Sequence, residues 1–327
     1  MIQDVIIKRI ADLIIQNLGK EKTAGLYNGK AGLALTLLMT AKYLNDEHIG
    51  EIAYHLLKES LVIQTNDISF ENGLSGIGYV LLYLIEKEYM EADIEDIFGT
   101  QYEEIIRSFD NIDNYPDKLI KYLSTVYFLT KFGHIKKEDK RIQEVIKKIF
   151  VRIERFLTVQ FEHLSDINYL NNKLTILHIF NDYLKLIDYS CTYHVSASLL
   201  GIYTSLYQKG RIMSSLEMGY YLRKISIRNQ IVKYDDLIHE NILNGIKNIP
   251  LDMLSLRERI DLAKIISDLN YKDIQEHRLI HEIDHLYKDR RLQDLFVTTP
   301  EMFSPMGYGA GLARLLIYCV DNQAELL

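Results

Sequence analysis

The sequence has little of several residue types, and each shortage excludes a class of structure. It contains two cysteines, Cys191 and Cys319, too few for a framework of disulfide bonds. It has no tryptophan and only four prolines, so long stretches lack the residue that interrupts helices. Its longest uncharged apolar run, Ile77 to Ile85, is far shorter than the roughly 20 residues that span a bilayer. We therefore expect no membrane span.

The charge balance argues against a nucleic-acid partner. The net charge is −7, and no basic stripe is present to neutralise a phosphate backbone. Residues Met1 to Val5 lack the basic and apolar regions of a signal peptide. Together with the scarcity of cysteine, these features favour a cytoplasmic protein.

Apolar residues follow the helical period along most of the chain, and no segment alternates as a strand does. In residues 2–18 and 49–61 the apolar positions form a single face, which is typical of an outer helix. Residues 31–44 and 77–85 are apolar nearly all round, so other elements must cover them on every side. This alternation predicts an all-α fold with inner and outer helix layers, an α/α toroid.

The repeat length indicates helical hairpins. Gly32 and Gly76 are 44 residues apart, which leaves room for two helices of about 15 residues and their loops. We expect six or seven hairpins in a single domain, residues 1–327, because no flexible linker divides the chain. Inner helices are expected to begin near Gly29, Gly73, Lys118, His194, Leu254 and Gly307. Outer or linking helices are expected near 2–18, 46–63, 101–109, 138–160, 171–187, 213–229, 235–247 and 272–290.

One sequence motif recurs. The segment Leu26-Tyr27-Asn28-Gly29-Lys30-Ala31-Gly32 returns as Phe70-Glu71-Asn72-Gly73-Leu74-Ser75-Gly76, and a looser copy, Pro305 to Ala313, lies late in the sequence. Each copy opens an apolar helix, so the loops before the helices should gather at one end of the array. The paired glycines let a neighbouring backbone approach closely or let the chain turn sharply into the helix.

The residues beside these glycines are candidate substrate-binding residues. Helix N-termini attract anionic groups, so a peptide carboxylate or backbone could be held there. The asparagines have a second interpretation, because their side chains could simply cap the helices. The candidates are Tyr27, Asn28, Glu71, Asn72 and Tyr308.

The Gly-x-x-Gly motifs at Gly29–Gly32 and Gly73–Gly76 resemble those of the lanthionine synthetase C-like family. The resemblance implies an α/α toroid. It also implies a cyclase that adds cysteine thiols of a precursor peptide across dehydroalanine or dehydrobutyrine, forming thioether rings. A precursor peptide is then the expected partner, and a dehydratase or another peptide-modifying enzyme is a second one.

The resemblance also suggests catalytic residues. The family's middle His-Gly-x-x-Gly motif is similar to Tyr193-His194-Val195-Ser196-Ala197-Ser198, although both glycines are replaced. His194 then becomes the candidate catalytic histidine, and Tyr193 a candidate substrate contact. An acidic residue of an earlier repeat has a match in Asp113 or Asp117. The alternative for His194 is a buried, structural histidine.

The family's zinc ligands, two cysteines and a histidine in late repeats, are not found. The segment Met302-Phe303-Ser304-Pro305-Met306-Gly307 stands where Cys-His-Gly is expected, and Leu254 to Leu256 offers no cysteine. We therefore expect no cofactor and no metal site. Cys191 with His194 gives at most two ligands, too few for a site. The stripe His277, His281 and His285 most simply faces solvent.

These observations favour a zinc-independent lanthionine cyclase. A histidine near pKa 6.5 could accept the thiol proton or return it. The alternative is a non-catalytic scaffold that binds the precursor peptide or a modifying enzyme. A carbohydrate-active α/α toroid is a third interpretation, but such enzymes need two inward carboxylates, and only Glu71 is placed at the mouth.

Overall fold

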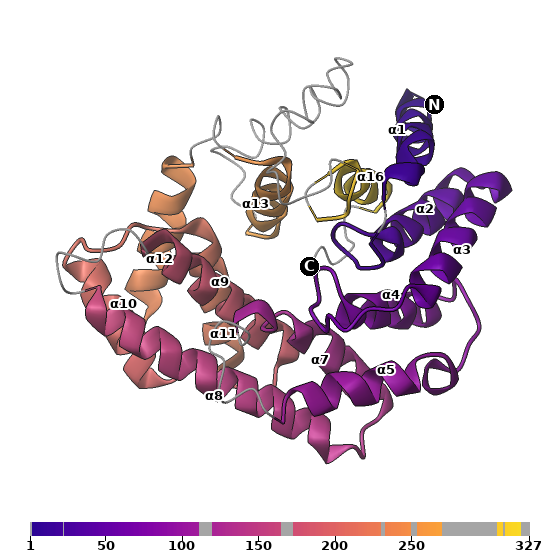
Figure 1. Cartoon of the computed structure of the whole chain (residues 1–327). Helices are drawn as coiled ribbons and strands as arrows, with labels where there is room; N and C mark the ends of the chain where they lie inside the picture. Colours follow the sequence, from indigo (N-terminus) through magenta and orange to yellow (C-terminus); the bar gives the residue numbers. More distant parts are fainter. Residues whose placement is uncertain are drawn as a thin grey trace. The chain divides into compact units, whose positions relative to one another are not determined.

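The computed structural model describes residues 2–21, 23–110, 120–164, 173–229, 233–249, 254–269, 306–309 and 311–321 (Figure 1). In these residues every regular element is a helix, and a single isolated bridge joins Thr23 to Gly29. The predicted all-α fold is confirmed. Within the span assigned to one domain, the backbone groups into two compact units. Unit 1 comprises Met1–Ile105 with Pro250–Leu327, and unit 2 comprises Ile106–Ile249.

Unit 1 joins the first repeats to the last one. Helix α2 packs against α1, α3, α4 and α16, and α16 packs against α1 and α13. The three helices that follow the recurring motif, α4, α2 and α16, are therefore neighbours. The helices of this unit are α1 (Ile2–Asn17), the 3-10 helix η1 (Leu18–Lys20), α2 (Lys30–Leu44), α3 (Glu47–Val62), α4 (Leu74–Glu86), most of α5 (Ile94–Ser108), α13 (Leu256–Asp268) and α16 (Leu312–Val320).

The two predicted kinds of helix are present in unit 1. Every residue of α2 from Ala31 to Thr40 is buried, as in a helix covered on all sides. In α3 the buried residues form one face: Ile49, Ala53, Leu56, Leu57 and Ser60. A tight turn joins the two helices, because Asn45 adopts a left-handed conformation and the Asp46 side chain caps α3 by accepting from the Ile49 N–H.

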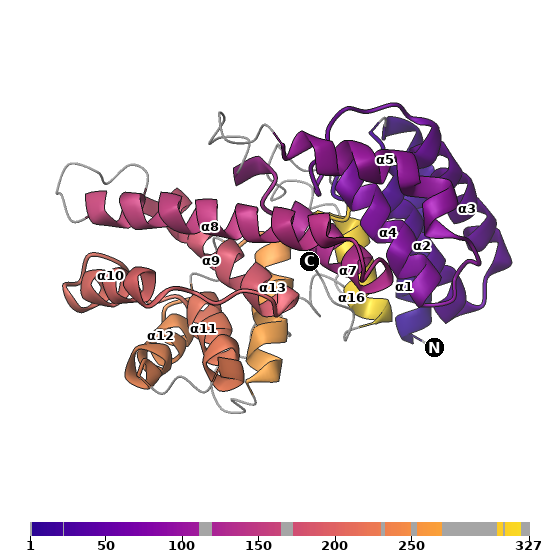
Figure 2. The ribbon, with the colours of Figure 1, turned by 90° about the horizontal axis from the view of Figure 1, so that it is seen from below.

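Unit 2 contains six helices among the described residues: α7 (Thr125–Ile135), α8 (Lys140–His163), α9 (Lys173–Ser190), α10 (Ala197–Gln208), α11 (Leu216–Asn229) and α12 (Asp235–Lys247). Helix α9 packs against α7, α8 and α11, whereas α10 packs against α8, and α11 pairs with α12. In Figure 2, α8 crosses the top of this unit and α10, α11 and α12 lie below it.

These contacts correct the expected layering of unit 2. An inner helix was expected to begin at His194, but α10, which follows it, lies against α8. Helix α9, expected as an outer or linking helix, lies between α7 and α11 instead. Burial gives the reason, since α10 buries only Leu199, Leu200, Tyr203 and Leu206. Helix α9 buries residues on most sides: Ile176, Ile179, Phe180, Asn181, Tyr183, Leu184, Leu186, Ile187 and Ser190.

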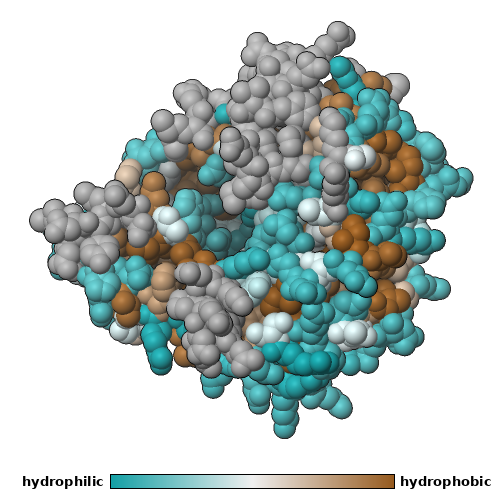
Figure 3. All heavy atoms as spheres, in the orientation of Figure 1, coloured by the Kyte–Doolittle hydropathy of each residue, from teal (hydrophilic) through white to brown (hydrophobic). Residues whose placement is uncertain are grey.

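The surface drawn in Figure 3 is mainly hydrophilic, and its hydrophobic residues fall into separate patches. Large exposed apolar side chains such as Val62, Leu174 and Met213 come from separate parts of the chain: α3, α9 and the segment between α10 and α11. In the part of the chain that the structure describes, no helix is both long and apolar enough to cross a membrane.

Candidate functional site

The three recurring loops of unit 1 lie side by side and pair through equivalent residues. The Gly309 N–H donates to the Tyr27 carbonyl at 2.9 Å, and the Tyr27 N–H donates to the Glu71 carbonyl at 2.6 Å. Each of these residues lies two positions before the glycine that caps its helix, Gly311, Gly29 or Gly73. The expectation that equivalent loops gather at one end is confirmed for these three loops.

In the first two loops, the second motif glycine allows the loop to fold back over its helix. A Cβ atom added to Gly32 would lie 1.9 Å from the Leu26 carbonyl oxygen, and one added to Gly76 would lie 2.0 Å from the Phe70 oxygen. No side chain fits at such distances. In the third copy, Arg314 stands at the equivalent position, three residues after its cap.

Tyr27 lies at the centre of the three loops. Its ring is 4% exposed and packs edge-on against Phe70, 6.2 Å between centroids, and at the same distance from Tyr308. The Arg257 guanidinium lies 4.7 Å from the ring centroid and donates to the Tyr27 hydroxyl at 3.0 Å. Burial raises the pKa of Tyr27, the charge of Arg257 opposes that shift, and the charge of Glu71 adds to it. The phenol is therefore neutral at pH 7.

Two arginines share one carboxylate beside Tyr27. Arg314 is fully buried and donates to Asp261 Oδ1 at 2.5 Å, and its guanidinium lies 5.8 Å from the Tyr308 ring centroid. Arg257 Nε lies 3.7 Å from Asp261 Oδ2. A buried arginine needs such a partner, because leaving its charge uncompensated is costly.

Arg257, Asp261 and Arg314 were not among the residues predicted from the sequence. One signal was present for Arg314, which is the only charged residue in the apolar sequence of α16, LARLLIYCV. Arg257 and Asp261 carried only an i,i+4 spacing, which is common on exposed helices. We call the combined set the loop cluster. It consists of Tyr27, Asn28, Glu71, Asn72, Arg257, Asp261, Tyr308 and Arg314.

The two asparagines pair with each other. Asn28 Nδ2 donates to Asn72 Oδ1 at 3.1 Å in an exposed position. The helix caps are Gly29 and Gly73, and neither α2 nor α4 has a side-chain cap. The capping interpretation of the asparagines is therefore wrong. Their amides lie at the exposed side of the loop cluster, where they can reach a ligand.

His194 lies in unit 2, in the loop between α9 and α10, and its side chain is exposed. Within the described residues it makes no hydrogen bond or ion pair, so the interpretation as a buried, structural histidine is wrong. Tyr193 stacks on Phe150, with 5.2 Å between ring centroids. Burial raises the pKa of Tyr193, and the charge of Glu154 adds to the shift. Glu154 also accepts a hydrogen bond from the Tyr183 hydroxyl at 2.6 Å.

The remaining candidates fall into two groups. Cys191 is exposed, has a φ of 54°, and donates from its thiol to the Asp188 carbonyl. The other candidates lie outside the described residues: Asp113, Asp117, His277, His281, His285 and the segment 302–305.

The loop cluster does not fit the zinc that the family resemblance implies. Zinc is bound in proteins by thiolate, imidazole and carboxylate groups, usually four of them. The equivalent loop positions here hold Tyr27, Glu71 and Gly309, and Cys319 lies eight residues beyond the cap of α16. The described residues contain no group of three or more His, Cys, Asp or Glu arranged to hold a metal ion.

The sequence profile of the lanthionine synthetase C-like protein family matches residues 8–183. The chain belongs to this family, whose members fold as α/α toroids. The match begins in α1 and ends in α9. No curated protein matches the sequence. No solved structure matches it either.

Proposed function

We propose that this lanthionine synthetase C-like protein acts in the maturation of a ribosomally made peptide, in the cytoplasm, and promotes thioether ring formation without zinc. The loop cluster binds the precursor peptide, and a dehydratase supplies the dehydrated residues. The observation that carries the proposal is the Tyr27–Arg257 pair, a neutral phenol held by a guanidinium beside two exposed amides.

The addition needs three groups. The cysteine thiolate attacks Cβ of a dehydroalanine, a C–S bond forms, and the electron pair of the double bond moves to the carbonyl oxygen as an enolate. A donor must stabilise that oxygen, and an acid must return a proton to Cα, so that the product has the mass of the substrate. Arg257 and the Asn28 amide are suitable donors, and the Tyr27 phenol is a suitable acid.

The thiol proton needs an acceptor. A free thiol near pKa 8.5 is only a few per cent ionised at neutral pH. His194, in unit 2, is proposed as this base, independently of the groups proposed in unit 1. Asp113, or alternatively Asp117, is proposed as the acidic catalytic residue that the family resemblance implies. Tyr193, Glu71, Asn72 and Tyr308 are proposed substrate contacts.

The test uses a peptide that contains dehydroalanine and a free cysteine. When the protein is present, we expect the peptide to lose its free thiol while its mass stays unchanged. A thiol-alkylating reagent should then no longer modify the peptide. Y27F and R257Q should each slow this loss about 100-fold or more, the range for removing a general acid or an oxyanion donor. Y54F is the matched control, because Tyr54 is an exposed tyrosine of α3.

The loss of both motif glycines beside His194 favours the second candidate function, a non-catalytic scaffold for the precursor or a modifying enzyme. His194→Ala separates the two functions, since the cyclase requires it to abolish ring formation and the scaffold leaves maturation unchanged. Peptide binding without any loss of free thiol would replace the first function by the second.

A further inference from the structure

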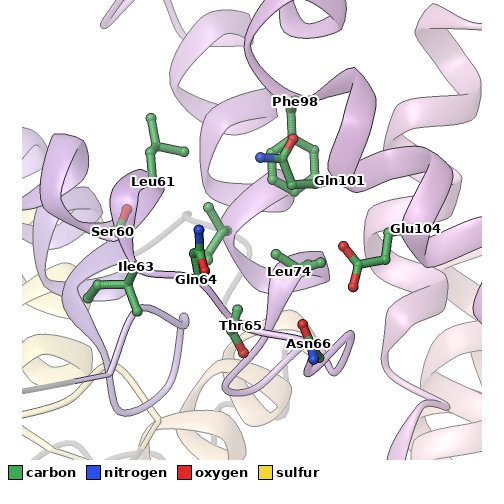
Figure 4. A pocket seen from close by; sticks show the side chains of 11 residues that line it. Ser60, Leu61, Ile63, Gln64, Thr65, Asn66, Leu74, Phe98, Gln101 and Glu104 are labelled. Atoms are coloured by element: carbon green, nitrogen blue, oxygen red, sulfur yellow. The ribbon is translucent and has the colours of Figure 1, made fainter.

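Unit 1 contains a cavity of about 250 Å³ that is separate from the loop cluster. It lies between the end of α3, the segment 63–66, the start of α4 and α5 (Figure 4). Ligand pockets for drug-sized molecules typically measure about 300–1,000 Å³. This cavity therefore suits a single long amino-acid side chain better than a nucleotide or another large cofactor.

The floor of the cavity is apolar. Leu74, Ile77 and Phe98 line it, and their exposed fractions are 6%, 2% and 1%. The one polar group at this depth, the Ser60 hydroxyl, already donates to the Leu57 carbonyl at 2.7 Å. The floor therefore favours a hydrocarbon chain over a polar one.

The mouth of the cavity is polar and carries a single charge. Gln64, Asn66, Gln101 and Glu104 surround the opening (Figure 4), and Glu104 is the only charged residue of the lining. Amide oxygens and a carboxylate accept hydrogen bonds from a cation, whereas the carboxylate repels an anion. An apolar floor below such acceptors matches a lysine or arginine side chain, whose apolar stem packs while its head stays at the mouth.

The backbone beside the mouth is open to a second chain. Ile63 has extended backbone angles, and residues 64–69 form neither helix nor turn. Among the described residues, none makes a backbone–backbone hydrogen bond to Gln64, Thr65 or Asn66. An extended peptide can pair with such a segment and place alternate side chains in pockets beside it.

We propose that this cavity binds a basic side chain of an extended peptide that lies along residues 63–66. The peptide is the precursor, and this identity rests on the proposed function, whereas the preference for a basic side chain does not. The cavity thus determines which part of a precursor is held beside it. The precursor residues that react bind at the loop cluster instead.

The test uses three capped tripeptides with lysine, norleucine or glutamate between two alanines, titrated into the full chain and followed by amide chemical shifts. We expect the lysine peptide to bind about fivefold more tightly than the norleucine peptide, as an ion pair at a partly exposed site provides. The glutamate peptide should bind most weakly. Shifts should centre on residues 64–66, 101 and 104.

Variants identify the groups responsible. E104Q should remove the preference for lysine over norleucine, and Q101W should block binding of both. E103Q, the next residue on α5, is the matched control and should leave the preference unchanged. Equal binding of lysine and norleucine, or loss of the preference in E103Q rather than in E104Q, overturns the proposal.

The outcomes separate this proposal from the proposed function. Selective lysine binding without any thiol loss refutes cyclisation and keeps the cavity. Thiol loss at a normal rate without lysine selectivity keeps cyclisation and refutes the cavity. Replacing each basic residue of a precursor in turn then shows whether the precursor is the occupant, because one replacement should weaken binding to the wild type but not to E104Q.

Discussion

Replacing a motif glycine by alanine is predicted to destabilise the protein, which is the opposite of the usual effect in a helix. Replacing glycine by alanine inside a helix normally stabilises the protein by about 1 kcal/mol, because alanine loses less backbone entropy on folding. At Gly32 the added Cβ would lie 1.9 Å from the Leu26 carbonyl oxygen and 2.9 Å from Tyr308 Cβ. The oxygen belongs to the backbone, so the whole loop must move before ordinary contact is restored.

The loss of stability can be estimated from the loop atoms that an added Cβ would displace. Overpacking costs about 1–3 kcal/mol. Displacing the loop also weakens the hydrogen bonds from the Lys30 and Ala31 N–H groups to the Thr23 and Ala24 carbonyls, both 3.0 Å, each worth about 1 kcal/mol. After the helix-propensity gain of about 1 kcal/mol, we expect Gly32→Ala to lower the free energy of unfolding by about 2 kcal/mol or more.

Two matched substitutions make the prediction sharp. Gly99 in α5 and Gly201 in α10 have nothing within 4 Å of an added Cβ, so each alanine should stabilise by about 0.5–1 kcal/mol. Gly76→Ala should behave as Gly32→Ala does, because its Cβ would lie 2.0 Å from the Phe70 oxygen. Urea unfolding followed by circular dichroism gives the four values. A Gly32→Ala protein as stable as the wild type would refute the close approach of loop and helix.

Two further predictions concern buried polar groups. Arg314→Leu should lower the free energy of unfolding by about 3 kcal/mol or more, because it leaves Asp261 without its buried partner; adding Asp261→Asn should recover much of the loss in urea unfolding, and strict additivity would contradict the pairing. Burial and the hydrogen bond to Glu154 raise the pKa of Tyr183, so above pH 10, where the unfolded phenol ionises and the folded one does not, stability should fall. The fall between pH 9 and 11 should be smaller in Tyr183→Phe than in the wild type or in Tyr54→Phe.

Helical periodicity predicted most elements well, and the exceptions have physical causes. Helix α3 was expected at 46–63 and spans Glu47–Val62, because its one-faced pattern and its Asp46 cap are both local. Helix α5 was expected from residue 101 but begins at Ile94, since Gly99 weakens the local preference for helix. Helix α16 was expected near Gly307 but begins at Leu312. Three glycines allow several starts there, and a hydrogen bond from the Ala313 N–H to the Met306 carbonyl selects one.

The candidate site was predictable only where repetition revealed it. The repeats predicted that five residues lie at one site, and the structure brings them together. They are Tyr27, Asn28, Glu71, Asn72 and Tyr308. Arg257 is 230 residues from Tyr27 in sequence, and no local pattern connects them. The layer of the helix after His194 was missed because α10 is short and rich in apolar residues, so its exposed face is hard to recognise.

The pairing of the last repeat with the first has a consequence for synthesis. Helix α2 (Lys30–Leu44) is synthesised long before α16 (Leu312–Val320), which packs against it. Throughout that interval the face of α2 that α16 covers stays open on the nascent chain, although α1, α3 and α4 already cover other faces, and open apolar surface is prone to aggregation. A chaperone that shields residues 30–44 until the C-terminal segment arrives would therefore raise the yield of native protein.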